Sequence, residues 1–249
     1  MPIDKAGTPV TRISRPSPDA IEVRGRDLCG DLMGRLTFTE YFHLLLTGDE
    51  PTADQRFFLD LLLVSIAEHG MMPTNVAARM TLAADPESLH GAVAAGILGC
   101  GPVILGTSGA CARLLASEDE PAAIVRAIRA ADGKVPGFGH PVHHPVDPRA
   151  QRILELADEH GVSGVYVERA RTFRNAVAEA WSKPLTMNVA MPIAAVMLDL
   201  GYSPAVVQTV PILARTAGLL AHLVEEQEHP AGFALAAGAE QAVEYRRDD

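Results

Sequence analysis

The sequence is poor in cysteine, and it has no segment typical of secretion or membrane insertion. The three cysteines, Cys29, Cys100 and Cys111, lack both the spacing of a metal site and the even number of a disulfide set. Met1–Ser17 has no apolar core, so we expect no signal peptide and a cytoplasmic protein. Residues 88–112 are uncharged but interrupted by glycines and a proline, so we interpret them as buried helices rather than a membrane span.

Basic residues are also scarce: 21 Lys and Arg stand against 31 Asp and Glu, for a net charge of −10. This balance argues against a nucleic-acid-binding surface, although a small anion could still bind beside local arginines. The length of 249 residues allows one large domain or two small ones. Strand-rich regions and repeats are missing, and the content of 48% hydrophobic residues, rich in Ala and Leu, favours a packed all-α protein.

One stretch, residues 133–149, carries three glycines, four prolines and three histidines within seventeen positions. Neither a helix nor a central strand tolerates this composition, so we expect an ordered loop. Asp147 suits the N-cap and Pro148 the first position of a helix that continues over 150–160. Arg149 then lies in the first turn, where the helix dipole disfavours a cation, and we infer that it meets an anion.

Apolar periodicity predicts helices through most of the remaining chain, after an irregular entry at 21–35 that we interpret as a short hairpin. The first helix opens with a capping box, Thr37 to Glu40. Pro211 is expected to kink the last long helix. The expected helices cover 37–46, 52–69, 87–99, 110–116, 121–131, 150–160, 165–181, 185–200 and 204–226.

Arg215 lies in an apolar part of that last helix, and a buried arginine needs an anion or a carbonyl as partner. His222 falls on the same helix face. An internal salt bridge with Asp199 is the structural alternative. Three further arginines are interpreted as a solvated face of their helix: Arg169, Arg171 and Arg174.

The histidines of the loop, His140, His143 and His144, raise the question of a metal. Pro141 and Pro145 prevent a one-face helical arrangement, and no Cys or acidic residue stands at a convincing spacing. We therefore predict no metal site.

The loop resembles the citrate synthase family, in which Gly-(Phe/Tyr)-Gly-His is followed by Asp-Pro-Arg. Gly137-Phe138-Gly139-His140 and Asp147-Pro148-Arg149 match this motif in order and spacing. In that family the His holds the keto or hydroxyl oxygen of oxaloacetate or citrate, the Arg binds a carboxylate, and the loop recognises coenzyme A. The implied CoA-binding residues are Val135, Pro136, Gly137, Phe138, Gly139 and Lys183.

Two other segments carry the same resemblance. Glu68-His69-Gly70 is similar to a family segment whose His binds a substrate carboxylate, although a plain helix-end histidine remains the alternative for His69. Ala214-Arg215-Thr216-Ala217-Gly218 resembles the late helix whose Arg grips a carboxylate. The resemblance thus implies a catalytic role for His140, and substrate binding by His69, Arg149 and Arg215.

Two departures concern the proton chemistry of the family. The catalytic Asp of the family stands in an Asn-Val-Asp segment, and the matching segment here, Asn188-Val189-Ala190, has alanine at that position. Losing a general acid–base typically lowers the rate by about 10²–10⁴-fold. The enol-stabilising His of the family, in Pro-Leu-His-Gly-Gly, has no counterpart here; we match its position to Leu105, or to Thr107 with a small shift. The possible substitutes are His90, Ser108 and His143, which the sequence does not rank.

The resemblance implies an all-α, citrate synthase-like fold. A large helical domain would comprise 18–111 and 183–249, and a small domain, 112–182, would carry the CoA loop. The short length resembles citryl-CoA lyase and the citrate synthase-like module of ATP-citrate lyase. We expect a homodimer that buries apolar helices such as 87–99.

The expected function is therefore cleavage of citryl-CoA, or a related 3-hydroxyacyl-CoA, to acetyl-CoA and an oxo acid such as oxaloacetate. The thioester would be the substrate, no other cofactor is expected, and di- or tricarboxylates are the expected ligands. A citrate synthase-type acyltransferase is the enzymatic alternative. A catalytically degenerate sensor of acyl-CoA or tricarboxylate, and a purely structural partner, are the non-enzymatic ones.

Overall fold

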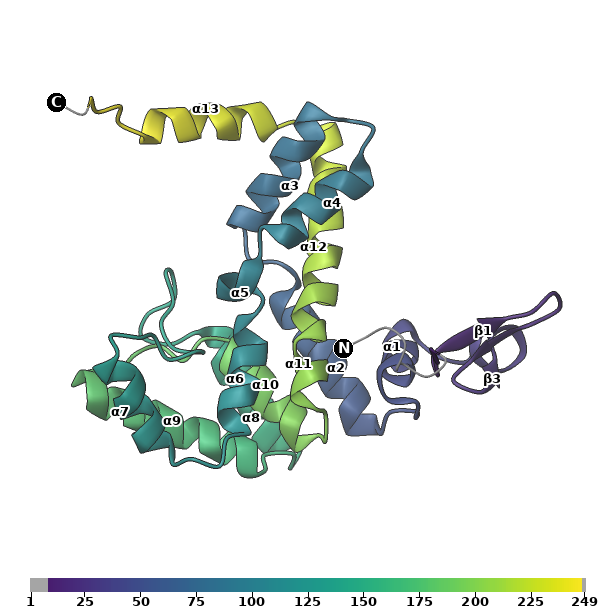
Figure 1. The fold of residues 1–249 in the computed structure, drawn as a ribbon, viewed down its shortest axis with the longest axis horizontal. Helices are drawn as coiled ribbons and strands as arrows, with labels where there is room; N and C mark the ends of the chain where they lie inside the picture. Colours follow the sequence, from purple (N-terminus) through teal and green to yellow (C-terminus); the bar gives the residue numbers. More distant parts are fainter. Residues whose placement is uncertain (1–8, 248–249) are drawn as a thin grey trace. The chain divides into compact units, whose positions relative to one another are not determined.

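The computed structural model describes residues 9–247, and the chain divides into two compact units, one ending at Asp60 and the other beginning at Leu61. The described residues form thirteen α-helices, one π-helical turn and one small antiparallel sheet (Figure 1). The predicted all-α class is confirmed. The division of a small domain at 112–182 from the remainder stays a prediction.

The first unit begins with a three-stranded antiparallel sheet in the order β1-β2-β3. Its strands are β1 (Ser14–Pro16), β2 (Ile21–Val23) and β3 (Arg26–Asp27), followed by the π-helical turn η2 (Leu28–Leu32). The expected hairpin at 21–35 is present as β2 and β3, and β1 extends it. An apolar cluster of Val23, Leu32 and Leu44 forms the buried core of this unit.

Helix α1 (Phe38–Thr47) shows how local sequence sets an element boundary. The hydroxyl of Thr37 accepts the backbone N–H of Glu40, and the Glu40 carboxylate accepts the backbone N–H of Thr37 at 2.7 Å. Gly48 ends the helix in a left-handed conformation, with φ of 94°. The predicted capping box is confirmed.

Helix α2 (Ala53–Ala67) contains the boundary between the units, and the remaining helices belong to the second unit. These are α3 (Pro73–Ala84), α4 (Leu89–Leu98), α5 (Gly101–Ile104), α6 (Thr107–Leu115), α7 (Pro121–Ala130), α8 (Pro148–Glu159), α9 (Val165–Trp181), α10 (Ala190–Asp199), α11 (Pro204–Val207), α12 (Thr209–Glu228) and α13 (Gly232–Ala242).

Two groups of helices meet along the second unit. Helix α10, buried from Ala190 through Leu198, packs against α6, α8, α9 and α11. Helix α12 packs with α3 and α4, which lie beside one half of it in Figure 1, and α13 packs on α3. A buried cluster that includes Ala78, Ala92 and Leu219 holds the α3–α4–α12 group together.

The last long helix differs from expectation at its beginning. Pro211 has no N–H to donate to the carbonyl of Val207, and its ring crowds that carbonyl. The regular helix is accordingly interrupted at Gln208, between α11 and α12. Helix α13 was not predicted.

The stretch Pro204–Glu228 is long and apolar enough to cross a membrane by length and composition alone. Core helices of soluble proteins pass the same test, and α12 carries the buried charged residues Arg215 and Glu226. Composition alone therefore does not distinguish a membrane span from a core helix here.

The apolar segment around α4 is less buried than expected. Gly96 faces Leu219 so closely that an added Cβ would lie 2.8 Å from a Leu219 methyl group, which shows how a small residue permits a close helix crossing. The outward positions are open, however, because α4 covers α12 with one face only. Leu98 is 82% exposed, and Val103 in α5 is 85% exposed.

Candidate functional site

The glycine- and histidine-rich loop is fixed to the segment that precedes α10. The Gly139 N–H donates to the Thr186 carbonyl at 2.7 Å, and the Asn188 N–H donates to the Gly137 carbonyl at 2.9 Å. Phe138 and Met187 pair as an isolated antiparallel bridge. The backbone that leads into His140 is therefore held in a defined path despite its lack of regular structure.

Gly137 is required by both conformation and space. Its φ is +82°, in the left-handed region, and an added Cβ would lie 2.8 Å from the Cys111 sulfur and 2.9 Å from Met191. The loop can approach α6 and α10 this closely only with glycine. This explains the glycine before Phe138 without reference to a ligand.

Asp147 caps α8 as predicted and also holds Arg149. Its fully buried carboxylate accepts the Arg149 backbone N–H at 3.1 Å and the guanidinium at 3.0 and 2.9 Å, and it accepts the Val189 N–H at 3.1 Å. Burial alone would raise the pKa of Asp147, but the hydrogen bonds and charge of Arg149 lower it overall. The anion inferred beside Arg149 is thus supplied in part by its own helix cap.

Three imidazoles from two separate segments meet beside Arg149. The Nε2 atoms of His69 and His143 lie 3.0 Å apart. The ring centroid of His140 lies 5.3 Å from that of His69 and 4.5 Å from that of His143. Sequence reasoning grouped His143 with His140 but missed His69, because His69 lies 74 positions away from His143 in the chain.

The hydrogen bonds of His140 determine which ring nitrogen carries its hydrogen. Nδ1 accepts the backbone N–H groups of Val142 at 3.0 Å and His143 at 2.9 Å. A nitrogen that accepts two N–H groups cannot itself be protonated, so the hydrogen of the neutral ring is on Nε2. The Nε2 atom of His140 lies 3.4 Å from a terminal nitrogen of Arg149. Because both groups are donors, a single oxygen atom could accept hydrogen bonds from both.

The pKa values of His69 and His140 are both lowered, which favours the neutral forms of these two rings. The pKa of His69 is lowered by burial first, and then by Arg149 and His143, against an opposing effect of Asp147. Burial is also the main cause of the lowered pKa of His140, which Asp147 opposes. Neutral imidazoles beside two arginines leave the site positive without charged histidines.

The three histidines offer ligand atoms within 4.8 Å of one another, a spacing that would suit a metal ion. The protonation of His140 argues against that use. Its Nδ1 is occupied by two backbone donors, and its Nε2 carries a hydrogen instead of a free lone pair. The sequence argument against a metal considered only the histidines of the loop and overlooked that His69 joins the cluster.

Arg215 is the most informative residue of the site. It is 3% exposed, and its guanidinium makes one hydrogen bond, to the Ile66 carbonyl at 3.3 Å. Among the described residues, nothing accepts from its Nε and one terminal nitrogen. The alternative partner Asp199 instead accepts the N–H groups of Gly164, Tyr166 and Val167 at the start of α9, so that salt bridge is wrong.

Arg215 and Arg149 both lower the pKa of His69 through their charge. The cations and the histidine cluster therefore share one electrostatic environment. Buried donors without a partner are costly and uncommon, and here they accompany a positive site. This arrangement suits a ligand with carboxylate groups.

A buried ionic network that the sequence did not predict connects α12 to the segment of His69. Arg79 donates to Glu226 at 2.9 Å and to Nδ1 of His222 at 3.1 Å, and also pairs with Glu225. The Nε2 of His222 in turn faces the Glu68 carboxylate at 3.0 Å. Nothing in the local sequence of Arg79 marks it as buried.

Glu68 completes this network by accepting the backbone N–H of His69 at 2.9 Å. Burial would raise the pKa of Glu68, but its hydrogen bonds, with that from His222 the strongest, lower it. The network therefore fixes both the α12 helix, which carries Arg215, and the start of the loop that carries His69.

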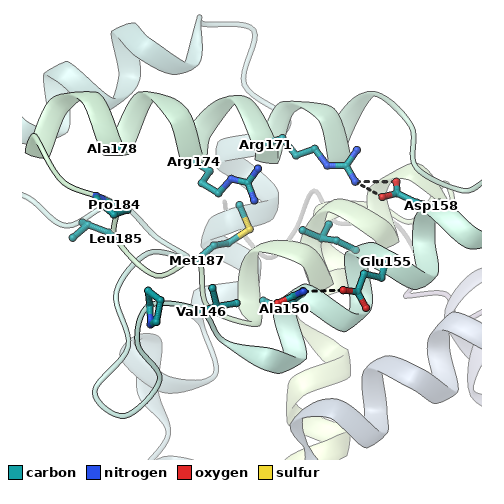
Figure 2. Close-up of a pocket in the computed structure, with 13 residues that line it drawn as sticks. Val146, Ala150, Glu155, Asp158, Arg171, Arg174, Ala178, Pro184, Leu185 and Met187 are labelled. Atoms are coloured by element: carbon teal, nitrogen blue, oxygen red, sulfur yellow. Dashed lines mark hydrogen bonds and ion pairs between the residues drawn. The ribbon is translucent and has the colours of Figure 1, made fainter.

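A pocket of about 500 Å³ is lined by residues of α8 and α9 and by Pro145 and Val146 of the loop (Figure 2). Its lining is mostly apolar and includes Val146, Met187 and Leu185. Arg171 at its edge is paired with Asp158, whereas Arg174 extends over the pocket beside Met187.

The other predicted residues fall as follows. Val135 is buried in the loop and Pro136 is half-buried. Lys183 is exposed, just before the segment that hydrogen-bonds to the loop. Ala190 is buried at the start of α10. Of the possible acid–base substitutes, His90 is exposed on α4 and Ser108 is buried in α6.

The missing enol-stabilising histidine needs one correction of register. Counted from Pro102, Ile104 rather than Leu105 stands at the position of that histidine. The sequence has no histidine at all between His90 and His140, so an imidazole is missing there in either register.

Comparison with known proteins identifies the family. The model of the citrate synthase C-terminal domain matches residues 24–232, and the chain belongs to the citrate synthase family. A solved structure of citryl-CoA lyase from Hydrogenobacter thermophilus is 28% identical, with a TM-score of 0.85 over 96% of this chain and 95% of that one.

Two further relatives are longer than this chain. Citrate synthase of Deinococcus radiodurans is 27% identical over 197 residues, which cover 76% of this chain and 52% of that protein. The ATP citrate lyase of Methanothrix soehngenii, solved with citrate and coenzyme A, shares the fold at 20% identity and a TM-score of 0.79, over 98% of this chain and 42% of its own. The chain spans about half the length of the curated relatives it matches.

Proposed function

We propose that the protein is a carbon–carbon lyase that cleaves citryl-CoA, or a related 3-hydroxyacyl-CoA, to acetyl-CoA and an oxo acid such as oxaloacetate. The similarity to citryl-CoA lyase over nearly the full length of both chains supports the lyase direction. The observation that carries the proposal is Arg215, whose buried guanidinium has N–H groups without a partner beside the histidine cluster.

The residues have complementary roles in this proposal. Arg215, Arg149 and His69 bind the carboxylates of the substrate. The Nε2–H of His140 and the neighbouring guanidinium of Arg149 both donate to the hydroxyl oxygen, which becomes the carbonyl oxygen of the product. Donors fixed before the reaction stabilise the negative charge that develops on this oxygen.

The thioester part of the substrate would lie along the loop from Val135 to Gly139. Lys183 is close in the chain to the segment before α10 that hydrogen-bonds to this loop. No cofactor other than the CoA thioester enters this proposal. The pocket between α8 and α9 borders the same loop, and Arg174 beside it could meet a phosphate of coenzyme A.

We further propose a cytoplasmic homodimer that acts on small molecules, not on nucleic acids or membranes. The exposed Leu98 and Val103 on α4 and α5 support a subunit interface. The net charge of −10 supports the exclusion of nucleic acids.

A second function has its own support. Ala190 cannot transfer a proton, and no imidazole replaces the family histidine near Pro102. These two losses favour a catalytically silent protein that binds an acyl-CoA or a tricarboxylate. A citrate synthase-type acyltransferase is the enzymatic alternative; it runs the same carbon–carbon chemistry in the opposite direction and needs the same acid–base group that Ala190 cannot supply.

The test is to incubate citryl-CoA with the purified protein and to follow acetyl-CoA and oxaloacetate by mass spectrometry. The lyase proposal expects both products, and expects Arg215→Met to abolish them. Thermal protection by citrate or CoA without turnover would contradict the lyase and support the silent binding protein. Neither turnover nor protection would contradict both.

A further inference from the structure

Cleavage of a 3-hydroxyacyl-CoA requires a group that removes the hydroxyl proton and a group that protonates the resulting enolate. Ala190 leaves the usual acid–base position empty of a titratable group. We propose that His143 is the acid–base residue that moves this proton. The inference rests on the proposed lyase function and names a residue for a step that it leaves unassigned.

His140 cannot serve as the base, although it is the nearest family residue. Its Nδ1 is occupied by the N–H groups of Val142 and His143, and its Nε2 already carries a hydrogen. To accept a proton, the ring would have to break both backbone hydrogen bonds. His140 is therefore a donor to the substrate oxygen throughout.

His143 has both the right position and an available nitrogen. Its ring lies 4.5 Å from that of His140, and its backbone N–H is fixed by the same His140 Nδ1, so the two rings are positioned together. Its Nε2 lies 3.0 Å from Nε2 of His69. In a neutral pair with this geometry, one Nε2 donates its N–H and the other Nε2 accepts with its lone pair.

The other possible substitutes lack these properties. His90 is exposed on α4, and it is not part of the histidine cluster. Ser108 is buried in α6, and a hydroxyl is a poor proton acceptor without a base beside it. Imidazole, by contrast, is the side-chain group that most often acts as a general acid–base.

The proposed step is balanced without any external reagent. When a substrate carboxylate accepts the hydrogen bond from the His69 N–H, His143 no longer accepts it. The Nε2 lone pair of His143 is then free. It accepts the hydroxyl proton; the O–H electrons form the carbonyl, and the electrons of the broken carbon–carbon bond form the thioester enolate. The imidazolium of His143 then returns the proton to the enolate carbon, which becomes the methyl group of acetyl-CoA.

The experiment compares turnover of citryl-CoA by the wild type, His143→Gln, His69→Gln and the surface control His90→Gln. Glutamine at 143 can still hydrogen-bond to His69 but cannot accept a proton. We expect His143→Gln to lower kcat by about 10²–10⁴-fold with little change in KM. His143→Ala should lose as much, and added imidazole should restore part of its turnover.

Each result has a distinct meaning. Wild-type kcat in His143→Gln would overturn the inference and leave the lyase standing. If His69→Gln were the one variant that loses kcat, and its KM stayed unchanged, the proton transfer would instead be assigned to His69. A wild type that binds citryl-CoA without cleaving it would overturn the proposed function, and the inference with it, before any variant is considered. Circular dichroism and thermal unfolding of each variant show whether a loss reflects misfolding.

Discussion

Asp147 and Arg149 form an ion pair across the first turn of α8, with the carboxylate fully buried and the guanidinium facing the histidine cluster. We expect Asp147→Asn to lower the free energy of unfolding by about 1–3 kcal/mol, because a charged acceptor of several hydrogen bonds is lost. It should also weaken citrate binding, since Arg149 loses its positioning. Urea unfolding and calorimetric titration with citrate measure the two effects.

The pair Asp158–Arg171 is the matched control, because it joins the same residue types at the surface. Asp158→Asn should change the unfolding free energy by no more than about 1 kcal/mol. The folded-state pKa of Asp147 is lowered, so its contribution to stability is present above the ordinary Asp pKa and is lost as the pH falls through the lower folded value. An equal loss in both variants would contradict the special role of Asp147.

Arg215→Met should have opposite effects on the free and the ligand-bound protein. Without ligand, the unfolding temperature should stay constant or rise, because a buried guanidinium with unpaired N–H groups is replaced by an apolar chain of similar volume. The thermal protection by citrate should disappear. Differential scanning fluorimetry with and without citrate measures both, and a surface change, Arg152→Met, should leave both as in the wild type. A large loss of stability without ligand would mean that Arg215 has a structural partner.

Two glycines of one loop separate backbone strain from steric contact. Gly137 and Gly139 both have positive φ, but an added Cβ meets Cys111 and Met191 only at Gly137. Gly139→Ala should therefore lower the unfolding free energy by about 1–2 kcal/mol, as expected for the left-handed conformation alone. Gly137→Ala should cost clearly more and should weaken CoA binding. Equal costs, measured by urea unfolding, would argue against the close approach of this loop to α6 and α10.

Local sequence predicted those features of the site that local interactions determine. The N-cap Asp147, the capping box at Thr37 and the loop from 133 to 149 depend on residues within a few positions, so the sequence specifies them. The pairing of His69 with His143 depends instead on tertiary packing across 74 positions. No periodicity or spacing encodes such a contact.

The same reasoning applies to the network of Arg79 and to the partner of Arg215. A charged residue in a helix is normally solvated, so the buried network of Arg79 gave no sequence signal. The burial of Arg215 could be predicted from its apolar neighbours, but its partner could not, and Asp199 proved to cap α9. The role of Arg215 in binding a carboxylate is implied by the family resemblance, not by local patterns, and it stays a prediction.

The histidine cluster predicts how stability depends on pH. Burial lowers the folded-state pKa of His69 and His140, so below the ordinary histidine pKa of about 6.5 the unfolded chain binds protons that the folded protein does not. Stability should therefore fall as the pH drops from about 6.5 toward the lower folded values. His69→Gln should make this decrease shallower. An unchanged slope of unfolding free energy against pH would contradict the burial of a neutral His69.

The exposed apolar residues of α4 and α5 predict the oligomeric state. Leu98 and Val103 stand largely in solvent in the single chain, next to a crossing with α12 that is built from small residues. Large exposed apolar side chains on neighbouring helices are typical of a subunit interface, and we expect Leu98→Glu with Val103→Glu to convert a dimer into a monomer.

Light scattering coupled to size exclusion measures that change. Phe38→Glu is the matched control, because Phe38 is also a large exposed apolar residue but begins α1 in the first unit. The control should leave the dimer intact, since Phe38 lies on α1 and not on the α4 and α5 surface of the proposed interface. A monomeric wild type would contradict the proposed homodimer. A dimer that survives both glutamates would place its interface elsewhere on the chain.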